Sequence, residues 1–233
     1  MSREFSEHLT RYPKFMLVVS LLIVALALLP MNRLGLTIDY KNYFDSSSLQ
    51  LKAMNQFEQT FFKDNSVIML LAPKNQQMFT PEHLQILTEL TEASWQMPHS
   101  TRVDSLSNFQ YSYAQGDDLI VSPFWGEQVN HKASDLNPAE INLIKTRALS
   151  EPSLAGNLIS KQGDVAAVIT YVQIPDNALK EVPEISNWSR ELLSQFSSKY
   201  PSVDFKITGT VLADQSFADA IEQDSQFLTP LSY

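Results

Sequence analysis

SVIMLLA, at residues 66–72, is a continuous apolar run with polar residues on both sides. It is too short to cross a bilayer and rich in branched side chains, which predicts a strand covered on both faces. A helix is expected next, because Thr80 suits the N-cap, Pro81 suits the first helical position, and apolar residues then recur at helical spacing. TRVDSL, at residues 101–106, predicts a shorter strand, so this part forms a β-α-β unit.

A second unit of the same kind follows later in the chain. DVAAVITYVQI, at residues 164–174, predicts a long strand, and a helix is expected between Pro183 and Pro201. VDFKI, at residues 203–207, alternates as a half-buried strand. Two β-α-β units predict an α+β fold with a ferredoxin-like (split β-α-β) lobe at residues 66–208. A small doubly wound sheet is the alternative.

Between the two units lies an inserted segment, which is predicted to be irregular and then helical. Asn137-Pro138-Ala139-Glu140 is a capping box with proline at the first helical position, and its helix is expected to end near Leu149. Before it, residues 107–134 are rich in aromatic side chains. These side chains are candidates for lining a substrate path for an apolar ligand; alternatively, they pack over the sheet as a small core of their own. The candidates are Phe109, Tyr111, Tyr113, Phe124 and Trp125.

The N-terminal part contains the longest apolar run, FMLVVSLLIVALALL at residues 15–29. It predicts a transmembrane helix over residues 15–31. Residues 1–14 hold three bases and two acids, which favours a cytoplasmic lead and a chain that is otherwise extracytoplasmic. The alternative is a cleaved signal peptide with a cleavage site at Ala25-Leu26-Ala27. Residues 32–65 are expected to form a connecting segment with a helix.

Composition and motifs argue against several classes of function. The chain carries a net charge of −9, with 26 acidic and 17 basic residues, which argues against nucleic-acid binding. It has no cysteine, which excludes disulfides, iron–sulfur clusters and thiolate zinc sites. The histidines form no metal-binding pair, and no G-x-S-x-G or glycine-rich phosphate loop occurs. We therefore expect no enzyme activity, no cofactor and no metal, and we interpret Asp117-Asp118 after Gly116 as a solvated turn.

The C-terminal residues 209–233 predict a last helix, amphipathic over residues 212–227. The sequence then ends in FLTPLSY at residues 227–233, without a polar closing segment. We expect this helix to lead to a second transmembrane helix that the chain does not contain.

Several of these features together resemble a known family. They are the N-terminal span, TIDYKNYFDSSS at residues 37–48, a helix with Phe57-Glu58 and Phe61, the strand SVIMLLA and the two β-α-β units. In this arrangement the chain resembles the first half of a resistance-nodulation-division (RND) exporter, of the bacterial branch related to Patched-like and mycobacterial lipid transporters.

The resemblance implies proton-driven export of hydrophobic or lipid-like substrates across the bacterial inner membrane, with the lobe in the periplasm. Its implied partners are the bilayer, a hydrophobic or amphiphilic substrate, the remainder of the transporter and further copies of the chain. The proton-relay carboxylates of that family lie in helices outside this chain. The alternative function is a single-pass, membrane-anchored domain that binds a partner or ligand.

Overall fold

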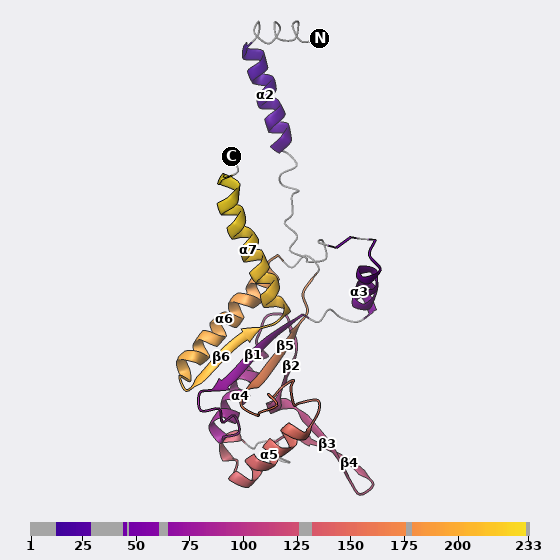
Figure 1. Cartoon of the computed structure of the whole chain (residues 1–233), viewed down its shortest axis with the longest axis vertical. Coiled ribbons are helices and arrows are strands. Elements are labelled where there is room, and N and C mark those ends of the chain that lie inside the picture. Colours follow the sequence, from indigo (N-terminus) through magenta and orange to yellow (C-terminus); the bar gives the residue numbers. More distant parts are fainter. Residues whose placement is uncertain are drawn as a thin grey trace. The chain divides into compact units, whose positions relative to one another are not determined.

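The computed structural model describes residues 13–28, 44–45, 47–60, 65–125, 132–175 and 179–231. The chain divides into a unit at Met1–Thr37 and a larger unit at Ile38–Tyr233. In the first unit the structure describes helix α2 (Pro13–Leu28). The larger unit begins with α3 (Leu49–Thr60) and continues into the α+β lobe, which is drawn from magenta to orange in Figure 1.

Four strands form the main sheet of the lobe. They are β1 (Ser66–Pro73), β2 (Ser100–Ser105), β5 (Ala166–Val172) and β6 (Val203–Thr208). The strand order is β2-β5-β1-β6, and every neighbouring pair is antiparallel. The two strands of each β-α-β unit are thus separated by one strand of the other unit, as in the split β-α-β arrangement. The predicted α+β class is confirmed, and the doubly wound parallel sheet is excluded by the antiparallel pairing.

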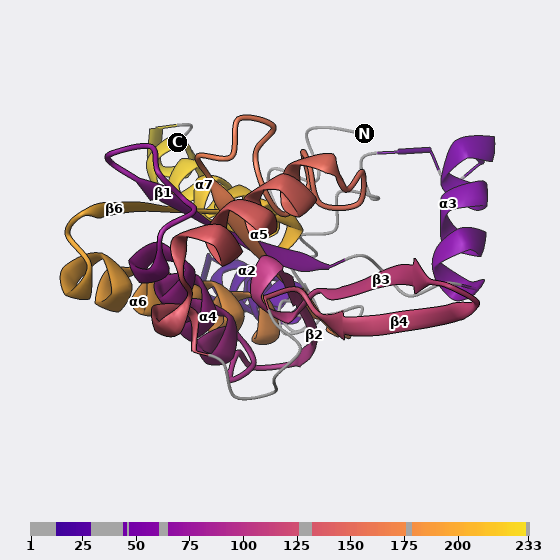
Figure 2. The same ribbon diagram turned by 90° about the horizontal axis from the view of Figure 1, so that it is seen from below.

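Helices α4 (Pro81–Ser94) and α6 (Glu181–Lys199) lie on the same side of this sheet, as Figure 2 shows. The side chains of the core come from the facing surfaces of the sheet and of these helices. Core residues on the strands alternate with less buried ones, as expected for a sheet with one fully covered face. The core includes Val67, Met69, Leu71, Val168, Leu84, Leu87, Leu90, Ile185, Leu192 and Phe196.

The burial pattern of β1 contradicts the prediction that this strand is covered on both faces. Val67, Met69 and Leu71 are fully buried, whereas Ile68 and Leu70 between them are only half-buried. The strand is therefore not fully covered on both faces. An apolar run alone does not distinguish these cases, because an apolar residue is tolerated on a half-covered face as well.

Local signals explain where two helices begin. The side chain of Thr80 accepts a hydrogen bond from the amide of His83, which caps α4. Asn137 caps α5 (Pro138–Ser150), and Glu140 returns a bond to the Asn137 amide, which completes the predicted capping box. Each cap satisfies amide groups that have no acceptor within their own helix.

The inserted segment differs from its prediction, because much of it is regular. Strands β3 (Gln110–Gln115) and β4 (Asp118–Pro123) pair as an antiparallel hairpin. Gly116 has a φ of 64° at the first position of its two-residue turn, where a type II′ turn favours glycine. Short 3₁₀ turns flank the hairpin at Leu106–Asn108 (η3) and Ala133–Asp135 (η4). The expectation of an irregular stretch at 107–134 was therefore wrong for the hairpin, while residues 126–131 lie outside the described residues.

The N-terminal helix differs from its prediction as well. Helix α2 has 16 residues, and none of the helices in the described ranges is both long enough and apolar enough for a membrane crossing. The predicted span at residues 15–31 is thus not supported by the described residues, because a crossing needs roughly 20 apolar residues. Residues 29–31 of that span lie outside the described part, as do residues 32–43, 46 and 61–64 of the connecting segment expected at residues 32–65.

The final element is a long helix, α7 (Thr210–Leu231), which packs against α6 and the ends of β1 and β6. Its existence agrees with the prediction of a last helix at residues 209–233. The acidic side chains Asp214, Asp219, Glu222 and Asp224 are distributed along it.

Candidate functional site

The aromatic residues singled out in the sequence gather at the base of the β3–β4 hairpin. The ring centroids of Phe109 and Phe124 are 5.9 Å apart in an edge-to-face contact, and Tyr111 and Phe124 make a second such contact at 5.9 Å. Tyr113 stacks on Tyr111 at 5.9 Å. Such contacts add to the hydrophobic gain from burying aromatic surface. The structure thus joins four of the five candidates into one cluster, called here the hairpin cluster.

The members of this cluster differ in exposure. Phe124 is only 1% exposed, and Trp125, the fifth candidate, is 8% exposed. Phe109 and Tyr111 are partly buried against the main core, and Tyr113 is half-buried on the hairpin. Two of the five candidates therefore have almost no surface with which to contact a ligand. A ligand at this place would contact Tyr113 and the exposed parts of Phe109 and Tyr111.

Helix α5 adds a residue that the sequence did not indicate. The guanidinium of Arg147, in the last turn of α5, lies 4.9 Å from the ring centre of Tyr111 and 5.8 Å from that of Tyr113. These are cation–π distances. Arg147 is 36 positions after Tyr111, and neither its residue type nor its spacing marks it as part of an aromatic cluster. Only the packing of α5 beside the hairpin brings the three side chains together (Figures 1 and 2).

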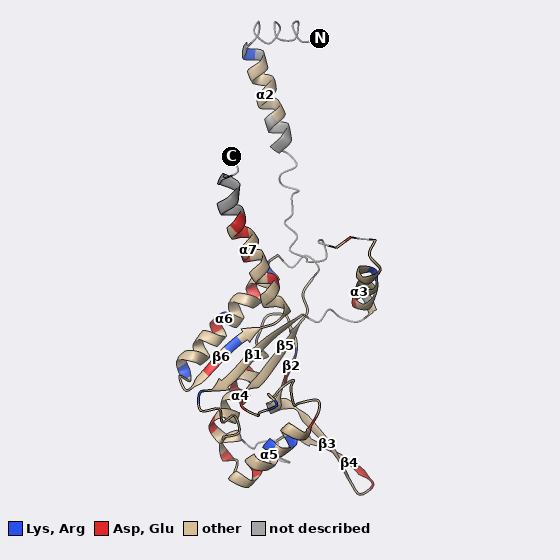
Figure 3. Cartoon of the chain, in the orientation of Figure 1, with Lys and Arg blue, Asp and Glu red and all other residues tan. Residues whose placement is uncertain are grey.

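Charge is unevenly distributed around the hairpin cluster. Figure 3 shows blue segments on α5 and a red segment at the tip of the β3–β4 hairpin. The acidic residues at the tip are Asp117, in the turn, and Asp118, which pairs with Gln115 at the start of β4. Their position agrees with the interpretation of this stretch as a turn. One basic side chain, Arg147, thus lies at the base of the hairpin, and two acidic side chains lie at its tip.

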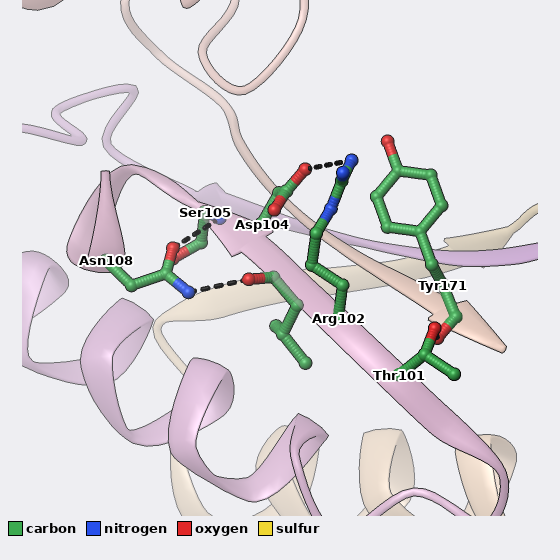
Figure 4. A network of polar contacts seen from close by, with 7 residues as sticks. Thr101, Arg102, Asp104, Ser105, Asn108 and Tyr171 are labelled. Atoms are coloured by element: carbon green, nitrogen blue, oxygen red, sulfur yellow. Dashed lines mark hydrogen bonds and ion pairs between the residues drawn. The ribbon is translucent and has the colours of Figure 1, made fainter. Parts of the chain in front are cut away.

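A polar network covers the outer edge of the sheet at β2 (Figure 4). Arg102 donates to Asp104 at 2.8 Å and lies 4.2 Å from the ring centre of Tyr171 on β5. At the end of β2, Asn108 donates to the carbonyl of Val103 at 2.6 Å and accepts from the Ser105 amide at 2.9 Å. Charged side chains on an edge strand, and hydrogen bonds that satisfy the backbone groups at its end, hinder its pairing with another chain. We interpret this network as structural.

A second polar group joins α4 to the end of α6. The carboxylate of Glu89 accepts hydrogen bonds from Lys199, at 2.8 Å, and from the hydroxyl of Tyr200. Burial by itself would raise the pKa of Glu89, but the bonds from Lys199 and Tyr200 outweigh it and hold the pKa below its ordinary value. Burial and the bond to Glu89 raise the pKa of Tyr200. The group ties α4 to the end of α6.

The two ends of the lobe meet at the start of β1. The amide of Ser66 donates to the Oγ1 of Thr210 at 2.9 Å, across 144 positions of sequence. Gly209, which directly precedes Thr210, has a φ of 126°. A Cβ at this position would lie 2.3 Å from the carbonyl oxygen of Ser66. The backbone thus approaches itself so closely here that only glycine fits. The chain enters the lobe beside the point where it leaves.

Metal-ligating side chains do not cluster in the part of the chain that the structure describes. Within those residues, no three histidine or acidic side chains gather in a way that could hold a metal ion. What the hairpin cluster offers is apolar ring surface beside a positive charge, which suits binding. No protein-family model matches this chain, and no curated protein matches it either.

Proposed function

We propose that this chain supplies the first span and the extracytoplasmic porter-type lobe of a proton-driven RND exporter for hydrophobic or lipid-like molecules. In this proposal residues 15–31 cross the bacterial inner membrane, residues 1–14 stay in the cytoplasm, and the lobe at residues 66–208 contacts the substrate. The chain itself performs no chemical step. The proton-relay carboxylates belong to helices outside it.

The observation that carries the proposal is the hydrogen bond between Ser66 and Thr210. A lobe placed between two membrane segments of one polypeptide needs its entry and its exit side by side, because both segments return to the same membrane. Domains whose two ends are close together are the ones that tolerate such insertion. The apolar run before β1 and the long helix α7 after β6 agree with this arrangement.

The location of the lobe can be tested directly because the chain has no cysteine. A single cysteine replaces exposed Ser112 on the hairpin, or Ser2 in the N-terminal lead, and intact spheroplasts are treated with a membrane-impermeant maleimide. We expect S112C to be labelled in intact spheroplasts and S2C only after permeabilisation. The cysteine-free parent is the control for background labelling. Labelling of S2C from outside, or protection of S112C, would overturn the proposed orientation.

A second experiment separates the exporter from the alternative, a membrane-anchored binding domain. Cells that produce the protein containing this chain are loaded with a hydrophobic dye, and its efflux is followed with and without a protonophore. Protonophore-sensitive efflux that depends on the protein supports the exporter. If the lobe is extracytoplasmic but no efflux occurs, and the coding DNA beyond codon 233 holds no further apolar spans, the anchored binding domain is the better description.

A further inference from the structure

Arg147 is half-buried, and it differs in its surroundings from two exposed cations of the lobe. Arg102 has Asp104 as a carboxylate partner at 2.8 Å, and Lys199 has Glu89 at 2.8 Å. Arg147 is half-buried, yet among the described residues no carboxylate lies within ion-pair distance of it. Burial of a cation without an anion is costly. In a chain with 26 acidic residues, such an arginine is a candidate for an anion supplied by a ligand.

The contact with the tyrosines leaves the guanidinium able to bind that anion. The guanidinium of Arg147 contacts the rings of Tyr111 and Tyr113, and a cation–π contact requires no hydrogen bond from its N–H groups. Its five N–H donors point outward in the plane and match a carboxylate or phosphate with two parallel hydrogen bonds. The two rings also hold the side chain in place, so less conformational freedom is lost when the anion binds.

Apolar surface continues from the cation in two directions. Ile120 is paired with Tyr113 across the hairpin and therefore lies on the same face. Leu143 precedes Arg147 by one helical turn on the same side of α5, and it is 49% exposed. A ligand that binds here has apolar surface next to its charged group. A small inorganic anion would leave that surface uncovered.

We propose that Arg147, Tyr111 and Tyr113 form a binding site for an anionic amphiphile, with the phosphate or carboxylate on Arg147 and the hydrocarbon chain along Tyr113, Ile120 and Leu143. The site deepens the proposed function, on which it rests for the role of the ligand as transported substrate. It narrows the substrate class from hydrophobic molecules in general to those with a negative headgroup.

The test uses the full chain in uncharged detergent and measures the binding of octyl phosphate by equilibrium dialysis, with protein-free micelles as the baseline. Octanol and inorganic phosphate are measured in parallel. We expect octyl phosphate to bind at least about tenfold more tightly than either, since it alone supplies both the charge and the chain. Equal binding of inorganic phosphate would overturn the apolar part of the site, and equal binding of octanol would overturn the role of the charge.

Variants identify the residue that recognises the charge. R147Q should weaken octyl phosphate binding about tenfold or more, which corresponds to loss of a hydrogen bond to a charged group. R147K should bind octyl phosphate with intermediate affinity, because lysine keeps the positive charge but lacks the planar guanidinium that donates two parallel hydrogen bonds. The matched control is K145Q, since Lys145 is exposed and two residues before Arg147, on the far side of the helix. It should change binding by less than about twofold.

The outcomes separate this site from the proposed function. Unchanged binding in R147Q, with a thermal unfolding midpoint equal to that of the parent, would overturn the site even if S112C is labelled from outside and the dye is exported. Weak binding in R147Q but not in K145Q would support it even if efflux is absent, in which case the amphiphile is a ligand of an anchored binding domain. A thermal unfolding midpoint of R147Q equal to that of the parent shows that any loss of binding does not come from misfolding.

Discussion

The amide of Ser66 and the Oγ1 of Thr210 are joined by a hydrogen bond of 2.9 Å, although 144 positions separate them in sequence. The bond connects the first residue of β1 to the first residue of α7 and so closes the lobe at the point where the chain enters and leaves it. Gly209 makes the closure possible, because its backbone passes within contact distance of Ser66. The stability of this junction bears on the proposed function, since the proposal requires the entry and the exit of the lobe to lie side by side.

Replacing Gly209 by alanine should destabilise the lobe strongly. The new Cβ would lie 2.3 Å from the carbonyl oxygen of Ser66, at a φ of 126° that side chains other than glycine rarely adopt. We expect a loss of roughly 3 kcal/mol or more in the free energy of unfolding, measured by urea denaturation of the full chain. G116A is the matched control, because Gly116 also has a positive φ but open space around it, and it should cost only about 1 kcal/mol. Similar losses in the two variants would show that the close approach is unimportant.

Thr210→Val should weaken the same junction by removing its hydroxyl at nearly constant shape. The amide of Ser66 would then lose its acceptor, at a cost of about 1 kcal/mol. Amide hydrogen exchange at Ser66 is the direct measurement, and its protection should fall in T210V. T210S keeps the hydroxyl and should retain the protection. Equal exchange rates in both variants would contradict the assigned bond.

Phe124→Ala should reveal how far the hairpin cluster acts as a core. Phe124 is 1% exposed and makes edge-to-face contacts with Phe109 and Tyr111, so its truncation should cost about 3–5 kcal/mol. V121A, on the opposite face of the hairpin and 57% exposed, should cost less than about 0.5 kcal/mol. Thermal unfolding of both variants beside the parent provides the comparison. A small effect of F124A would mean that the cluster is not packed as described.

Glu89→Gln should destabilise the protein in a pH-dependent way. The bonds from Lys199 and Tyr200 hold the pKa of Glu89 below its ordinary value. The charged carboxylate therefore stabilises the folded state fully at pH values above the ordinary pKa. This stabilisation is lost as the pH falls through the lowered pKa. The pKa of Tyr200 is raised. The contribution of Tyr200 to stability is therefore present at pH values below its ordinary pKa and is lost as the pH rises through the raised pKa.

Because Glu89 and Lys199 are 31% and 61% exposed, the expected cost of E89Q at neutral pH is only about 0.5–1 kcal/mol. The parent and E89Q should converge in stability only once the pH has fallen below the lowered pKa of Glu89. E92Q, an exposed change on the same helix, should differ little from the parent at any pH. A cost of E89Q that persists unchanged in acid would rule out the charge as its cause.

Several elements could be predicted because their signals are local. Thr80 and Pro81 mark the start of α4, and the capping box at Asn137 and Glu140 marks the start of α5. The hairpin was missed although Tyr111 and Tyr113 alternate before Gly116, because the aromatic content of this stretch was interpreted as a feature of a loop. That signal was present in the sequence. The pairing of Tyr113 with Ile120 follows from it once the turn is recognised.

The sequence by itself determined the type and order of the four strands of the main sheet and of helices α4, α5 and α6, because caps, turns and hydrophobic periodicity act over a few residues. It also supplied the acidic charge and the aromatic residues of the hairpin cluster. Tertiary structure alone decided that Arg147 lies over Tyr111 and that Thr210 binds Ser66. These contacts depend on how the elements pack and on which strands pair, and the strength of such contacts depends on proximity in space rather than on spacing along the chain.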